Sequence, residues 1–101
     1  MPRSDPKQRK AQIMEAALTL ARRNGFESVR MEGIANEAGC VNGLVVHYWG
    51  TMSQLRRAIM REAVRIEDLQ LVAQGLAVGH PAARKAPQAL KEQAAAYLVG
   101  V

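Results

Sequence analysis

The chain has 101 residues, which is enough for one small domain with an appended helical element and too few for a second full domain. Fourteen Lys and Arg residues against nine Asp and Glu residues give a formal charge of +5. This balance favours a polyanionic partner such as nucleic acid, although a basic soluble protein without such a partner has the same composition.

Cysteine usage and hydropathy exclude several other classes of protein. Cys40 is the single cysteine, so no internal disulfide can form, and this is compatible with a reducing cytoplasm. The N-terminal residues contain no apolar core of the kind found in signal peptides, and no apolar run approaches the roughly 20 residues of a membrane span. We therefore expect a soluble cytoplasmic protein that has no membrane partner.

The first patterned segment predicts a helix over residues 6–24. Asp5 can accept hydrogen bonds from the free amides of a first turn, and Pro6 suits the first helical position. Asn24 and Gly25 form a stop signal. The apolar residues behind the start recur at helical spacing and are Ile13, Ala16, Ala17, Leu20 and Ala21. Phe26, which follows the stop, is a candidate core anchor.

Two short helices are predicted on either side of Gly39. The first covers residues 31–38, with Ile34, Ala35 and Ala38 on its inner side, and the second covers about residues 42–48. Gly39 is expected to have a positive φ, which glycine adopts without steric cost. A short helix, a tight glycine turn and a second short helix are the order of a helix-turn-helix, whose second helix enters the major groove of DNA.

Further helices are predicted after this unit. Thr51 and Gln54 have the spacing of a capping box, and the long helix that they begin is expected to run to Gly75. Residues 75–87 are interpreted as a linker, and Pro87 as the start of a short C-terminal helix. The fold class is therefore all-α: a three-helix helix-turn-helix domain, a long fourth helix and a short C-terminal helix.

Several landmarks together resemble the N-terminal DNA-binding domain of the tetracycline-repressor (TetR) family over about residues 8–62. They are Ile13, Ala16, Ala17, Leu20, Gly25, Phe26, Ile34, Ala35, Ala38, Gly39, Gly43, His47, Tyr48, Trp49 and Leu55. The resemblance implies a homodimeric bacterial transcriptional regulator, in most cases a repressor of a palindromic operator. It divides the chain into a basic arm (1–8), the helix-turn-helix domain (9–51) and a helical extension for dimerisation (52–101).

The resemblance also implies which residues contact DNA. On the second short helix they are Val41, Asn42, Gly43, Leu44, Val46, His47 and Tyr48. The amide of Asn42 can pair with a base edge or a phosphate, and Leu44 or Val46 can pack against a thymine methyl group. The chain departs from the family pattern, which usually has Ser at position 41, an aromatic residue at 46, Lys at 52, and Thr or Ser at 30.

Basic groups outside the second short helix can compensate for the missing polar contacts. The candidates are Arg30 and the arm residues Arg3, Lys7, Arg9 and Lys10, which could follow a phosphate strand or the minor groove. The alternative for the arm is a disordered basic tail.

Two apolar stripes are candidate dimer contacts. They consist of Ile59, Ala63, Ile66 and Leu69 on the fourth helix, and of Leu90, Ala94, Tyr97 and Leu98 on the C-terminal helix. The alternative is that the two helices pack against each other within one chain. The chain is also short for its family, so we expect no enclosed pocket for a small-molecule inducer.

The sequence shows no grouping that would support catalysis or metal binding. Cys40, His47 and His80 do not have the spacing of a metal site, and no nucleophile, base and orienting group occur together. We therefore expect no enzyme activity, no metal and no cofactor. A second hypothesis for function is a helical interaction protein that pairs with another regulator and binds operators weakly or not at all, which Val41, Val46 and Met52 would favour.

Overall fold

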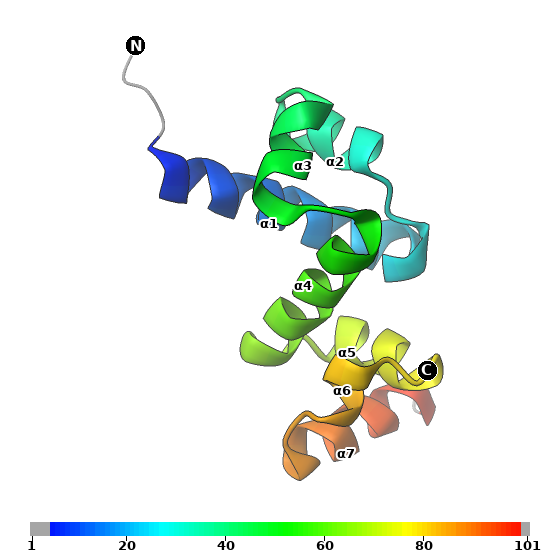
Figure 1. Cartoon of the computed structure of the whole chain (residues 1–101). Helices are drawn as coiled ribbons and strands as arrows, with labels where there is room; N and C mark the ends of the chain where they lie inside the picture. The colour runs from blue at the N-terminus through cyan, green and yellow to red at the C-terminus, as the bar shows by residue number, and fades with distance from the viewer. Residues whose placement is uncertain (1–4, 100–101) are drawn as a thin grey trace.

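The structure is a computed structural model that describes residues 5–99. These residues contain seven α-helices, one 3-10 turn and no strand, so the predicted all-α class is confirmed (Figure 1). In chain order the elements are α1 (Pro6–Asn24), η1 (Phe26–Ser28), α2 (Met31–Ala38), α3 (Asn42–Trp49), α4 (Met52–Arg65), α5 (Leu69–Ala77), α6 (Pro81–Arg84) and α7 (Gln88–Val99).

Helix α1 has the predicted bounds because both of its ends are specified locally. The Asp5 carboxylate accepts a hydrogen bond from the Gln8 amide at 2.8 Å, and Pro6 occupies the first turn. At the other end Gly25 adopts a φ of 93° and donates its amide to Ala21. Residues 6–8 of the predicted basic arm are therefore part of α1.

The first three helices enclose one core. Ile13 and Ala17 of α1, Ile34 of α2 and Val45 of α3 are fully buried, and Phe26 is buried beside them as predicted. Burial of these side chains removes apolar surface from water and fixes α2 and α3 against α1. Figure 1 shows α2 and α3 together at one end of the molecule and α6 and α7 at the other.

Helix α4 begins at the predicted capping box but ends ten residues before the predicted stop. Thr51 accepts from the Gln54 amide at 3.1 Å, and the Gln54 side chain accepts from the Thr51 amide at 2.8 Å. The helix then ends at Arg65 instead of continuing to Gly75. Glu67 adopts a φ of 56°, and Asp68 accepts from the Leu71 amide at 3.1 Å, which begins a new helix. The prediction of one continuous helix was wrong because an N-cap residue within the stripe interrupts it.

The break turns α5 back onto the C-terminal end of α1. The Gln70 side-chain amide donates to the Arg22 carbonyl at 2.8 Å, and the Gln74 side-chain oxygen accepts from the Phe26 amide at 2.8 Å. Arg22 also pairs with Asp68, with Nε and Oδ2 at 2.6 Å. These side chains satisfy backbone groups that a helix end leaves free, so α5 is attached to the helix-turn-helix unit.

The segment predicted as a linker is mostly ordered helix. Helix α5 continues to Ala77, and α6 follows with His80 as its N-cap, whose Nδ1 accepts from the Ala82 amide at 3.1 Å. Gly75 is buried where α4, α5 and α6 meet. A linker interpretation failed here because Gly and Pro also mark the short turns between closely packed helices.

Four of the predicted dimer residues belong to the core of the chain itself. Ile59 and Ala63 of α4 are fully buried, as is Ala94 of α7, and Leu90 is nearly so. Helix α7 packs mainly on α5, most of which belongs to the predicted fourth helix. Leu90 and Ala94 are therefore buried within the chain, as in the intramolecular alternative. Ile66 and Tyr97 stay exposed and Leu69 is half-buried, whereas the side chain of Leu98 lies outside the described residues.

Candidate nucleic-acid interface

The turn between α2 and α3 is built by glycine and the backbone. Gly39 has the left-handed conformation predicted for it, with φ 70° and ψ 37°. The Cys40 amide donates to the Ala35 carbonyl at 2.9 Å, which closes the last turn of α2 in a Schellman arrangement. A Cβ at Gly39 would meet no atom within 4 Å, so the requirement for glycine comes from φ and not from lack of space. This turn fixes the direction in which α3 leaves α2.

Helix α3 has an inner and an outer face. Val45 is fully buried, and Leu44, Tyr48 and Trp49 are half-buried against the core. The residues on the outer face are Val41, Asn42, Gly43, Val46 and His47, and all of them are exposed. The seven predicted contact residues therefore divide into five that face outward and two, Leu44 and Tyr48, that mainly hold the helix in place.

Two apolar side chains are conspicuous on the outer face. Val41 is 73% exposed and Val46 is 45% exposed. Val41 is also the N-cap of α3 and makes no side-chain capping hydrogen bond, as is true of Arg30 at the start of α2. At the N-cap position of Val41, Ser or Thr would stabilise the helix better than valine does. The exposure of Val41 and Val46 makes both side chains available to an external surface.

Gly43 lies on the same outer face and is not required by the fold. A Cβ built at this position meets no atom within 4 Å. We predict that Gly43→Ala raises the free energy of unfolding by up to about 1 kcal/mol, because Ala is the better helix former. The same substitution should weaken DNA binding, because a methyl group would hold the helix away from the groove. Urea denaturation should show the gain in stability, and a DNA titration of the same variant should show the weaker binding. A loss of stability would contradict the prediction.

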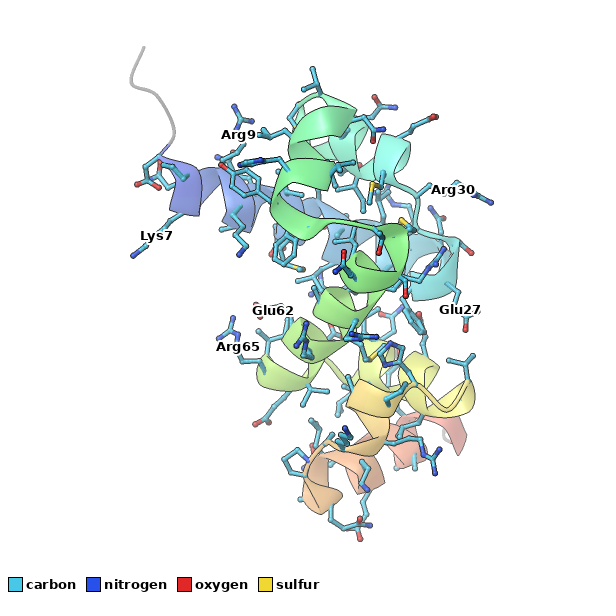
Figure 2. All side chains as sticks on the ribbon, in the orientation of Figure 1. Lys7, Arg9, Glu27, Arg30, Glu62 and Arg65 are labelled. Carbon is cyan, nitrogen blue, oxygen red and sulfur yellow. The ribbon has the colours of Figure 1, made fainter. Side chains whose placement is uncertain are left out.

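The basic residues predicted to assist α3 are not equivalent. Lys10 Nζ lies 4.8 Å from the centre of the Trp49 ring, a cation–π contact that ties α1 to the end of α3. In Figure 2, Arg9 points towards the end of the molecule that carries α2 and α3, Arg30 projects outward on the other side of α3, and Lys7 points away. Arg3 lies outside the described residues. Lys10 is thus in contact with α3, and Arg9 and Arg30 lie on either side of α3 in this view.

A surface ion pair with short hydrogen bonds lies on α4. Glu62 and Arg65 on α4 form two hydrogen bonds, of 2.7 and 2.5 Å. The hydrogen bond from Arg65 lowers the pKa of the Glu62 carboxyl and raises the pKa of the guanidinium. Both side chains lie towards the middle of the molecule in Figure 2 and line the same hollow as Lys10 of α1 and Trp49 of α3. Each charge is paired with the other, so the pair adds no net charge to this surface.

The geometry of α2, the Gly39 turn and α3 agrees with comparisons to known proteins. Residues 13–59 match the family model described as bacterial regulatory proteins of the tetR family. These residues are a TetR-family DNA-binding domain. The match begins within α1 and ends within α4, so the TetR domain includes the core residues Ile13, Ile34, Val45 and Ile59.

A curated relative supports the same assignment. The HTH-type transcriptional regulator BetI of Vibrio atlanticus (strain LGP32) is 35% identical over 60 residues. The match covers 59% of this chain and 30% of BetI, so the two proteins share the TetR domain and not their full lengths. No solved structure matches the chain significantly.

Some contacts of α3 carried no recognisable signal in the sequence. The contact between Lys10 and Trp49 joins residues 39 positions apart, and the edge-on packing of the His47 and Tyr48 rings, with centroids 5.1 Å apart, depends on rotamers.

No helix within residues 5–99 combines the length and the apolar character needed to cross a lipid bilayer.

Proposed function

We propose that the chain is a cytoplasmic, sequence-specific transcriptional regulator, most simply a repressor, which binds a palindromic operator as a homodimer. The observation that carries the proposal is the exposed face of α3, held by the Gly39 turn within a TetR-family domain. In a helix-turn-helix this face lies in the major groove, where side chains meet base edges.

Each outward residue has a distinct role in the proposal. Asn42 can donate to and accept from an adenine edge, and His47 can donate to a phosphate or a base. Val46 and Val41 are suited to thymine methyl groups. Gly43 permits close approach of the α3 backbone. Arg9 and Arg30, with Arg3, Lys7 and Lys10, would neutralise phosphates and make binding salt-dependent.

The homodimer is proposed because one helix-turn-helix makes few base contacts, and two half-sites bound together raise the effective affinity. The residues left for the interface are those of the predicted stripes that stay exposed, chiefly Ile66 and Tyr97. Tyr97 is 43% exposed on α7. Leu69 and Leu98 complete the proposed interface. The proposal does not include a small-molecule inducer bound within an enclosed cavity.

The test begins with selection of operators from a random DNA library by the purified chain. A palindromic consensus, bound by two chains in a mobility-shift titration, is the expected result. Asn42→Ala and His47→Ala should each weaken the selected site roughly tenfold, while thermal stability changes by less than about 1 kcal/mol. Gln88→Ala, an exposed change at the first residue of α7 and far from Tyr97 along the helix, is the matched control and should leave binding unchanged.

Two results would contradict the proposal. Failure to enrich any sequence, at low salt as well as at high salt, would favour the helical interaction protein that pairs with another regulator. Equal loss of affinity for all sequences in the Asn42→Ala variant would show that α3 binds DNA without reading it.

A further inference from the structure

A groove lies on the opposite half of the molecule from α3. Helix α6 lies against α4, and the hollow between them has a volume of about 540 Å³. This volume is within the range of pockets that hold small molecules. Its apolar lining includes Val64 of α4, Ala82 of α6, and Ala86 in the turn after α6.

The charged groups of the groove all have the same sign. Arg57 and Arg61 lie one turn apart on α4, and Lys85 faces them from the end of α6. None of the described residues that line the groove carries a carboxylate, and these three cations form no ion pair with any residue of the range 5–99. Three like charges around one hollow repel one another, and a bound anion would relieve that repulsion.

A neighbouring histidine lies close enough to Arg57 to be affected by its charge. The pKa of His80 is lowered, first by burial and second by the charge of Arg57, while Glu27 opposes the shift. His80 begins the same short helix that carries Lys85 to the groove.

We propose that the groove between α4 and α6 is a binding site for an organic anion that has an apolar body and one acidic group. The acidic group would lie between Arg57, Arg61 and Lys85, and the apolar body would cover Val64, Ala82 and Ala86. DNA is a poor occupant of the same site, because Figure 1 places α6 at the end of the molecule remote from α3. The site is therefore separate from the proposed operator contact.

Hexanoate is a suitable probe, with hexanamide as the uncharged molecule of the same shape and inorganic phosphate as an anion without an apolar body. Calorimetric titration should show saturable binding of hexanoate at millimolar concentrations, and much weaker binding of both comparison molecules. The amide NMR signals of Val64, Ala82, Lys85 and Ala86 should shift, and those of α3 should not. Absence of saturable hexanoate binding, or equal binding of hexanamide or phosphate, would overturn the proposal.

Two neighbouring residues at the end of α6 provide a matched pair of variants. Lys85, the C-cap, lines the groove, whereas Arg84 is also exposed and does not line the groove. Lys85→Glu should weaken hexanoate binding roughly tenfold, because an attraction becomes a repulsion. Arg84→Glu, which makes the same change in net charge, should alter binding less than about twofold. Equal effects of the two variants would assign the binding to net charge and overturn the site. Neither outcome depends on whether the chain binds an operator.

Discussion

Gly39→Val is expected to lower the free energy of unfolding by about 2–3 kcal/mol, because a β-branched residue is strained at positive φ. Gly39 has a φ of 70° and open space around its Cα, so the whole cost is conformational. Relief of the strain would require Gly39 to leave the left-handed region, which would change the direction of α3. We therefore expect specific DNA binding to be lost together with stability, as measured by urea denaturation and by titration of the selected operator.

Gly79→Val is the matched control for this prediction. Gly79 has a φ of 69° and likewise has no atom within 4 Å of an added Cβ, but it lies between α5 and α6. The two variants should lose similar stability, whereas only Gly39→Val should lose operator binding at temperatures where both are folded. If Gly79→Val lost operator binding to the same extent, the effect would be one of global stability and not of the α3 direction.

The parts of the fold that were predicted correctly are specified by neighbouring residues. Asp5 and Pro6 begin α1, Gly39 ends α2, and Thr51 and Gln54 begin α4, each through contacts within four residues of one another. Such signals can be read from the sequence because the atoms that satisfy a helix end lie next to it in the chain.

The errors concern contacts between distant residues. The apolar stripe from Leu55 to Ala73 has helical spacing throughout, and spacing alone does not show that Asp68 ends one helix and begins another. The pairing of Asp68 with Arg22, which lies 46 residues earlier, is one of the contacts that attach the new helix to α1. The same limitation applies to the stripe residues Ile59 and Ala94, since periodicity shows that a face is buried but not by which chain.

The candidate interface was predicted at the level of the helix and only partly at the level of the side chain. Asn42, Val46 and His47, which were predicted as contacts, face outward, whereas Val45 is fully buried. Leu44 and Tyr48 were proposed as contacts, yet they are half-buried against the core. An eight-residue helix in which most side chains are apolar has no clear polar face, so the rotation of α3 depends on packing that the sequence alone does not specify.

Asp68→Ala is expected to lower the free energy of unfolding by about 2 kcal/mol, because two interactions are lost together. The carboxylate accepts from the Leu71 amide at the start of α5 and pairs with Arg22 of α1 at 2.6 Å. The Asp68 side chain is 12% exposed and that of Arg22 is 34% exposed, so water screens the pair only in part. Urea denaturation of the variant measures the combined loss.

Two further variants separate the interactions of Asp68. Asp68→Asn can keep the hydrogen bond to the Leu71 amide while it removes the charge, and Arg22→Ala removes the pair and keeps the cap. Each should cost about half as much as Asp68→Ala, and their effects should not add, since both remove the same ion pair. Additive losses would show that the pair contributes little. In that case the glutamine side chains of α5, which bond the end of α1, would be the main attachment of α5 to the DNA-binding domain.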